Sequence, residues 1–203
     1  MWIDSNLNLI LASASPRRRQ LLEQIQVPVE QLVVPTEGED EPRLPRETVT
    51  DYVTRTAHDK LIRTANHWHE QHPNQTMPPM LAADTTVAIG QTILGKPQDE
   101  ADARRILTAL AGKTHDVYTA VAMVHQGHEH KTVVHSTVEI DGALIDAIDD
   151  YIASGEPFGK AGAYGIQGIA AAYIKGLAGS YSSVVGLPLY ETAQLLRQAG
   201  LYR

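Results

Sequence analysis

The chain has no cysteine among its 203 residues. That absence excludes disulfide bonds and thiolate metal sites, and it is typical of proteins of the reducing cytoplasm, where we expect this one to work. No apolar run approaches the ~20 residues that a membrane-spanning helix needs. The N-terminus also lacks a basic segment ahead of a hydrophobic one. The sequence therefore predicts neither a membrane protein nor an exported one.

Basic residues are in the minority: 17 lysines and arginines stand against 24 aspartates and glutamates, a formal net charge of −7. This balance argues against sequence-independent binding of nucleic acid, which relies on a broad basic face. A small phosphorylated ligand held by a few local cations remains compatible with it. Because 43% of the residues are hydrophobic, the chain can bury a sizeable core, and we expect residues 1–203 to form one domain.

The most informative local segment is 9–22, LILASASPRRRQLL. It predicts a buried strand that ends near Ala12 and a helix that begins after Ser15, a favourable N-cap. Arg17 and Arg18 would lie in the first turn, where the helix dipole disfavours cations. A bound anion would resolve that conflict, since helix starts bind phosphates and arginine binds their oxygens in pairs. A capped, solvated helix start explains the same residues, and the segment alone leaves both interpretations open.

Apolar periodicity elsewhere predicts alternating helices and strands. Helices are expected over residues 17–25, 46–65, 99–110, 144–153 and 188–199. Strands are expected over 27–34, 80–89 and 92–94, and in two hairpins that pair 115–124 with 132–140 and 170–174 with 180–185. The remaining segments are expected to be an acidic loop, an exposed polar connection and a glycine-rich loop, over 35–45, 66–79 and 155–168. This pattern predicts a mixed α/β fold of two lobes with a cleft between them.

Asp84 lies inside the apolar run MLAADTTVAI. A lone carboxylate in a buried strand is costly unless it is hydrogen-bonded, paired or bound to a metal, so Asp84 is a candidate catalytic residue. The structural alternative is that it caps a turn at the end of the strand. Lys96 follows a strand in a stiff Gly-Lys-Pro turn, where it would either hold a phosphate or be exposed. Further carboxylates come from the acidic loop, of which at most one or two would reach a site: Glu37, Glu39, Asp40 and Glu41.

The segment 159–168, GKAGAYGIQG, would let the backbone approach a ligand closely. It matches neither the dinucleotide-binding GxGxxG motif nor the P-loop. The amide of Gln167 complements O4 and N3–H of uracil or thymine, although a solvated glutamine is the simpler interpretation. Histidines 67, 69 and 72 resemble a metal site only in their spacing, and we expect them to be exposed.

Five segments in this order, SASPRR, AADTTV, LGKP, GKAGAYGIQG and VVGLPLYET, make the chain resemble the Maf family of nucleotide pyrophosphatases from about residue 9 to about residue 196. The GAYGIQG form resembles the branch that hydrolyses dTTP and UTP, not the branch that acts on 7-methyl-GTP. The resemblance implies cleavage between the α and β phosphates, dependence on Mg²⁺ or Mn²⁺, a cytoplasmic location and a homodimer. It also implies an elongated, twisted mixed β-sheet flanked by helices, with the site in the cleft between two lobes.

The resemblance assigns roles to particular positions. Asp84 matches the family's catalytic proton acceptor, and with Glu41, or another carboxylate of the acidic loop, it would hold the metal. The positions that match phosphate-binding residues are Ser13, Arg17, Arg18, Lys60 and Lys96. The positions tied to substrate choice are Arg17, Thr85 and Gln167.

Together these observations predict that the triphosphate lies along the helix start while Asp84 orients or deprotonates the attacking water. Arg17, Arg18, Lys60 and Lys96 would offset its charge. Two alternatives stay open. One is a related pyrophosphatase for a modified or purine nucleotide. The other is a non-catalytic, nucleotide-binding regulator of cell division that acts through a partner protein, since the family has been associated with septum formation.

Overall fold

The computed structural model describes residues 7–35 and 42–202. Seven strands form one mixed sheet: β1 (Leu9–Leu11), β2 (Val29–Gln31), β3 (Met80–Ile89), β4 (Thr92–Leu94), β5 (Thr114–His125), β6 (His128–Ile140) and β7 (Ile174–Ala178). The helices are α1 (Pro16–Gln24), α2 (Val49–Gln71), α3 (Glu100–Leu110), α4 (Leu144–Ala153), α5 (Tyr181–Val185) and α6 (Leu189–Gln198). Two short 3₁₀ turns are η1 (Ala161–Ala163) and η2 (Ile169–Tyr173). The predicted mixed α/β class is confirmed.

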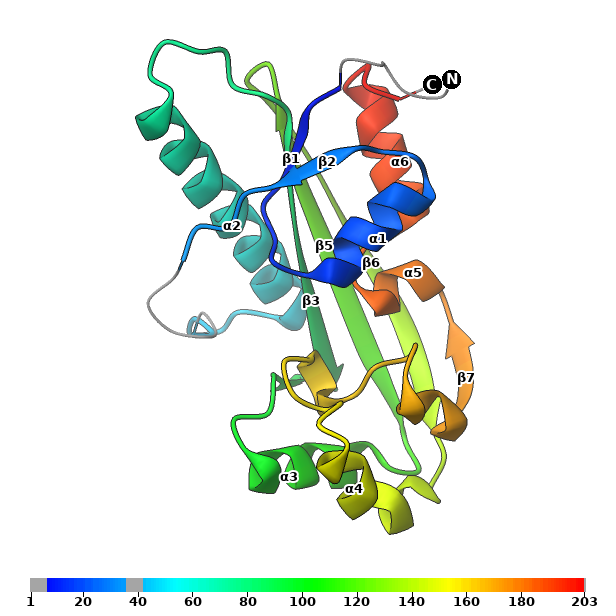
Figure 1. Ribbon diagram of the computed structural model, residues 1–203. Helices are drawn as coiled ribbons and strands as arrows, with labels where there is room; N and C mark the ends of the chain where they lie inside the picture. The colour runs from blue at the N-terminus through cyan, green and yellow to red at the C-terminus, as the bar shows by residue number, and fades with distance from the viewer. Residues whose placement is uncertain (1–6, 36–41, 203) are drawn as a thin grey trace.

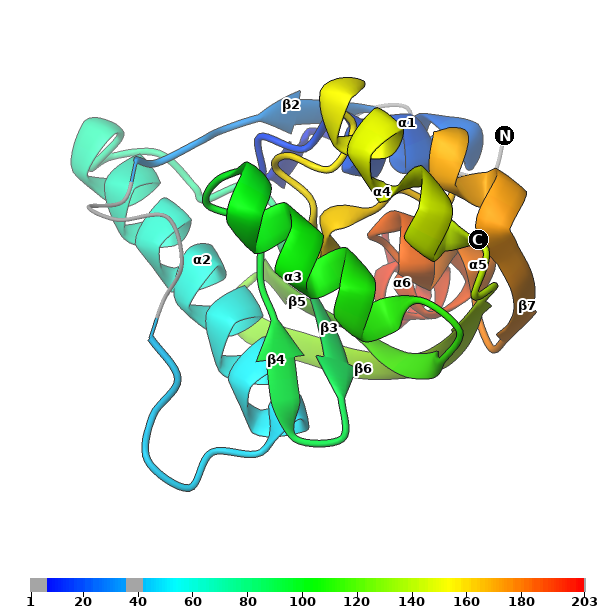
Figure 2. The same ribbon diagram turned by 90° about the horizontal axis from the view of Figure 1, so that it is seen from below.

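The sheet has the order β2-β1-β3-β5-β6-β7, with β4 paired to β3. β1 is parallel to both of its neighbours, and the other pairings are antiparallel. The long strands β3, β5 and β6 run the length of an elongated molecule and twist as they go (Figure 1). α2 covers one face of the sheet, and α1, α5 and α6 lie on the other. The helices α3 and α4 pack side by side at one end, as Figure 2 shows.

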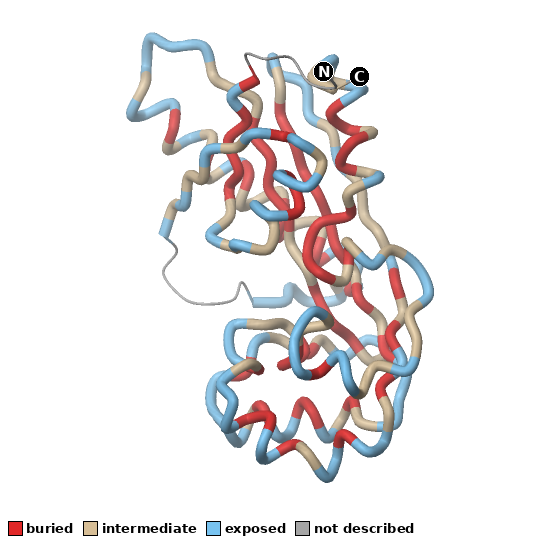
Figure 3. Tube along the Cα trace, turned by 45° about the vertical axis from the view of Figure 1, so that its right-hand side comes forward, coloured by how far each residue is buried: buried red, intermediate tan, exposed pale blue. Residues whose placement is uncertain are grey.

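Separate apolar clusters fill the two ends of the sheet. One lies between α3, α4 and the sheet and includes Leu107, Leu144 and Val138. The second joins β1 to α1 and α6 through Leu9, Leu22 and other side chains. A third lies under α2. Buried residues follow the central strands from one end of the molecule to the other (Figure 3). These shared strands therefore join the apolar clusters at the two ends of the sheet into one fold.

Capping residues place the helix starts where the sequence predicts them. Ser15 caps α1, and its Oγ accepts a hydrogen bond from the Arg18 backbone N–H at 3.5 Å. Asp99 caps α3 in the same way, accepting from the backbone N–H of Asp102 at 2.7 Å. Such caps satisfy backbone donors that the first helical turn leaves unpaired. The helix start beside Arg17 is therefore as predicted.

The second predicted hairpin is wrong. Residues 170–174 form most of the turn η2 and only the first residue of β7, and β7 pairs with β6. Residues 181–185 form α5, because Ser180 is an N-cap whose Oγ accepts from the Ser183 backbone N–H at 3.2 Å. One edge of the long strand β6 pairs with β5, and β7 pairs with the other edge. β7 therefore pairs with β6 and not with residues 180–185, as the predicted hairpin required.

The prediction of an exposed connection over 66–79 is wrong for its first part, because α2 continues through Gln71. Leu61 and Trp68 extend its apolar face, and Trp68 is only 9% exposed. Trp68 also stacks on His72, with ring centroids 4.6 Å apart. Of the three histidines, His69 is exposed and the other two are half-buried. In the ranges that the structure describes, no helix has the length and apolarity to cross a bilayer.

Candidate active site

A gap in the sheet creates the site. β3 pairs with β5 along one edge, so β1 and β4 share its other edge. β1 pairs with it as far as Leu81 and β4 from Val87 onward. In the described part of the chain, residues 82–86 therefore have no strand partner on that edge. Asp84 and Thr85 lie in this gap, beside the carboxyl end of β1, which is where α/β sheets commonly form a ligand crevice.

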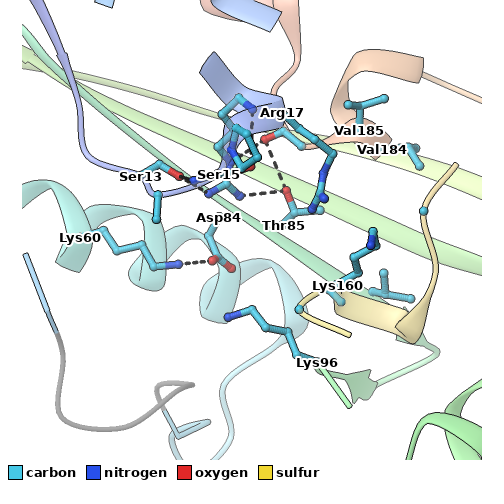
Figure 4. A pocket seen from close by; sticks show the side chains of 18 of the residues that line it. Ser13, Ser15, Arg17, Lys60, Asp84, Thr85, Lys96, Lys160, Val184 and Val185 are labelled. Atoms are coloured by element: carbon cyan, nitrogen blue, oxygen red, sulfur yellow. Dashed lines mark hydrogen bonds and ion pairs between the residues drawn. The ribbon is translucent and has the colours of Figure 1, made fainter. Parts of the chain in front are cut away.

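A cavity of about 750 Å³ opens over this gap. Figure 4 shows side chains from both lobes converging on it. Its described lining includes six cationic side chains, Arg17, Arg18, Lys60, Arg63, Lys96 and Lys160. The carboxylates in the same lining are Asp84 and Glu156. Since the whole chain carries a formal charge of −7, this local excess of positive charge suits a polyanionic ligand.

Asp84 is an ionised carboxylate in the middle of β3. Its Oδ1 accepts a hydrogen bond from the Lys60 ammonium of α2 (Figure 4), and its Oδ2 accepts from Thr86 Oγ1 at 3.3 Å. Burial on its own would raise the pKa of Asp84, but the positive charges of Lys60 and Arg18 outweigh it and hold the pKa below its ordinary value. Asp84 does not cap a turn, so the structural alternative is wrong. Lys60, predicted to bind phosphate, lies against this carboxylate.

The guanidinium of Arg18 donates hydrogen bonds to three other parts of the protein. Nε donates to the Gly186 carbonyl at 2.9 Å, Nη1 to Ser13 Oγ at 3.1 Å and Nη2 to Thr85 Oγ1 at 3.3 Å. These bonds join α1, the loop before it, β3 and the turn after α5. Burial lowers the pKa of Arg18, an effect that the charge of Asp84 opposes. That Ser13 and Arg18 also contact phosphate stays a prediction.

Two cations of the cavity, Arg63 and Lys160, were not predicted from the sequence. Arg63 follows Lys60 by three residues on α2, a spacing that places both on one helix face. Lys160 was visible as the lysine of GKAGAYGIQG, and its ammonium donates to the Glu156 carbonyl. Burial and the charge of Arg17 lower its pKa. Its proximity to Arg17 means that the glycine-rich loop faces the start of α1 across the cavity.

The glycine-rich loop brings Gln167 to the edge of the cavity, where it is exposed. Gly162 allows the loop to lie close to β3, because it has a φ of +71° and a Cβ there would come within 2.9 Å of the Val87 side chain. Tyr164 anchors the loop from below, with Oη 2.8 Å from Nε2 of His115 on β5. The loop is thus fixed to the sheet just before the turn that carries Gln167.

His115 makes stability depend on pH. It is 2% exposed, and burial lowers its pKa from 6.5 to about 4. Between these values the unfolded chain binds the proton and the folded one does not, so stability falls as pH falls. From pH 7.5 to 5.0 we expect this one histidine to remove about 2 kcal/mol. Urea unfolding of wild type and His115→Gln at both pH values measures it; parallel pH dependences would contradict the assignment.

Glu41 and the rest of the predicted acidic cluster lie outside the described residues. Across residues 7–35 and 42–202, no three histidine or carboxylate side chains gather into a metal-binding group.

The fold and the cavity define the class: an α/β protein with a cation-lined cleft over an ionised aspartate, suited to bind a polyanion. The chain belongs to the Maf-like protein family, whose model matches residues 8–199.

Curated relatives match nearly the full chain. A protein of Bordetella parapertussis named dTTP/UTP pyrophosphatase is 53% identical over 95% of this chain and 93% of its own length. Proteins of the same name from Cupriavidus metallidurans and Nitrosomonas europaea are 46% and 45% identical, over 96% and 95% of this chain and 98% and 95% of their own. A solved HAM1 protein from Coxiella burnetii overlaps 67% of this chain and 74% of its own at 18% identity and a TM-score of 0.38, which is too low to carry an argument.

Proposed function

We propose that this protein hydrolyses dTTP and UTP between the α and β phosphates, releasing the nucleoside monophosphate and pyrophosphate. The observation that carries the proposal is that Asp84, paired with Lys60, lies in a cavity whose described lining includes six cationic side chains. Relatives with this printed name, similar over nearly the whole chain, support the choice of substrate. The cellular role that follows is removal of unwanted nucleotides from the pool.

The triphosphate would lie between the start of α1 and the glycine-rich loop. There the Arg17 side chain and the side chains of Lys96 and Lys160 line the same cavity (Figure 4). Cations on both sides of the phosphates stabilise the charge that develops on the departing pyrophosphate, which is the main source of catalysis in phosphoryl transfer. The hydrogen bond from Arg18 to Ser13 Oγ holds the start of α1 against the loop before it, and so helps to keep Arg17 in place.

Asp84 would orient the attacking water. Because its pKa is lowered, it stays ionised at neutral pH and is a weak proton acceptor. Holding a cation and accepting a hydrogen bond from water suit such a carboxylate better than full proton abstraction. Lys60 fixes the carboxylate by donating to Oδ1, so α2 sets the direction in which Asp84 faces the substrate.

The described donor set fits a divalent cation shared with substrate. Magnesium commonly takes one or two protein carboxylates and completes its shell with phosphate oxygens and water. Asp84 supplies one such carboxylate, and a second, predicted to be Glu41, would come from outside the described residues. When bound, Mg²⁺ or Mn²⁺ would neutralise part of the phosphate charge.

The family resemblance further implies that the protein is a homodimer and works in the cytoplasm. Sedimentation velocity of the purified protein tests whether it is a dimer.

The reaction is tested by hydrolysing dTTP in ¹⁸O-labelled water with Mg²⁺ present. Water that attacks the α phosphorus, with pyrophosphate leaving, places the label in the monophosphate. We expect unlabelled pyrophosphate and labelled dTMP. Release of inorganic phosphate, or label in the pyrophosphate, would overturn the proposed cleavage.

Gln167→Glu tests base choice. The substitution keeps the shape of the side chain and removes the amide donor that would pair with O4 of thymine or uracil. We expect kcat/KM for dTTP and UTP to fall about 10- to 100-fold, with a much smaller change for other triphosphates. Gln198→Glu, the same change on an exposed residue of α6, is the control. An equal loss on every base would remove Gln167 from base recognition.

A further inference from the structure

Glu156 is an unexpected side chain in this cavity, because a carboxylate there opposes the binding of a triphosphate. Both of its oxygens are engaged by the protein. Oε1 accepts a hydrogen bond from the hydroxyl of Tyr151 on α4 at 2.8 Å, and Oε2 accepts from the backbone N–H of Ile169 at 2.8 Å. The carboxylate therefore has two partners, one on α4 and one at the first residue of η2, directly after the glycine-rich loop.

These contacts enclose the turn that carries Gln167. The Gly165 backbone N–H donates to Tyr151 Oη at 3.4 Å, and the Gly168 N–H donates to the Gly165 carbonyl at 3.1 Å. One end of the turn is thus held by Tyr151 and the residue after its other end by Glu156, which are bonded to each other.

The carboxylate also lies directly against the turn. A Cβ added to Gly168 would come within 2.3 Å of both Glu156 carboxylate oxygens. Gly168 has a φ of −109°, which other residues adopt, so close approach to Glu156 is the reason for glycine here. The Lys160 ammonium holds the same segment by donating to the Glu156 carbonyl. The start and the end of the loop are therefore fixed on one residue.

We propose that Glu156, together with Tyr151, is a positioning residue that fixes Gln167 for reading the base. The proposal rests on the function proposed above and names the part of the structure that makes it selective. An exposed glutamine on an unsupported loop occupies many positions, and two hydrogen bonds to a base edge discriminate only when both groups are held in place. The negative charge of Glu156 is tolerated at an anion site because it holds this turn.

The test measures kcat and KM for dTTP and dCTP with wild type, Glu156→Ala and Tyr151→Phe. We expect Glu156→Ala to lower the dTTP to dCTP ratio of kcat/KM by about 10-fold or more, mainly through a higher KM for dTTP. Turnover of saturating dCTP should stay within about three-fold of wild type, since the phosphate-binding side chains are unchanged. Tyr151→Phe should shift the ratio in the same direction by less. Glu70→Ala, on an exposed part of α2, is the control and should change nothing.

A double-mutant cycle isolates the contact. Gly168→Ala alone should collapse the base ratio, because its Cβ displaces the Glu156 carboxylate, whereas Gly168→Ala combined with Glu156→Ala should be no worse than Glu156→Ala. If Glu156→Ala does not fold, Glu156→Leu takes its place, since it keeps most of the side-chain volume but has no oxygen to accept from Tyr151 or Ile169. Uniform losses on both bases, or additive effects in the cycle, overturn the positioning role while wild-type activity upholds the proposed function. An inactive wild type overturns the proposed function itself.

Discussion

Asp84→Asn is expected to lower kcat for pyrophosphate release from dTTP by about 1,000-fold or more. The asparagine keeps the size of the side chain but removes the charge that would hold a cation and orient water. Lys60, which now pairs with the carboxylate, would also lose its partner. Steady-state kinetics with dTTP and UTP, at saturating Mg²⁺, measure the change.

A matched control separates chemistry from folding. Asp116→Asn makes the same change on β5 of the same sheet, in a carboxylate that pairs with His135 at 2.6 Å and does not line the cavity. It should keep wild-type turnover within about two-fold. Far-ultraviolet circular dichroism of both variants should match wild type. Turnover of Asp84→Asn near that of Asp116→Asn would remove Asp84 from catalysis.

Replacing Arg18 with Met is expected to destabilise the protein by about 3 kcal/mol, the largest stability effect at the site. The substitution removes the three hydrogen bonds that Arg18 donates to the Gly186 carbonyl, Ser13 Oγ and Thr85 Oγ1, and with them the link between these segments. Arg18→Lys should recover little of this loss, because a single ammonium cannot reproduce a planar fork that reaches three separate elements.

The neighbouring arginine gives the contrast. Arg17→Met removes the same charge from the same helix turn, yet we expect a change in stability within about 0.5 kcal/mol and a clear rise in KM for dTTP. Urea denaturation gives the stability of both variants under identical conditions. Equal unfolding midpoints for Arg18→Met and wild type would contradict the structural role of Arg18, and an unchanged KM for Arg17→Met would contradict its contact with substrate.

The parts of this molecule that were predictable from sequence depend on local rules. Ser15 and Asp99 cap helices because their side chains reach N–H groups three residues ahead, and Asp84 is conspicuous because it interrupts an apolar strand. These relations lie within a few residues, so the order of amino acids is sufficient to find them. The motif order likewise led to the family that the comparisons confirm.

What the sequence did not reveal depends on contacts between distant segments. The internal role of Arg18 requires Gly186, 168 residues away. The place of β7 depends on the free edge of β6, and α5 replaces a predicted strand because Ser180 begins a helix there. The sequence does not single out Glu156, since nothing in the neighbouring residues shows that Ile169 would bond to it. Contacts between distant segments determine each of these features, and the secondary-structure propensities of the local residues do not predict such contacts.

The most direct test of the proposed dTTP and UTP pyrophosphatase activity is pyrophosphate release by the wild-type protein with Mg²⁺ or Mn²⁺. It is measured with each of the common nucleoside triphosphates and with 7-methyl-GTP. We expect release from dTTP and UTP well above that from every other nucleotide, and none without the metal. Selective release from another base would keep the chemistry and contradict the role of Gln167. No release from any nucleotide, with binding intact, would contradict the enzyme and favour a nucleotide-binding regulator.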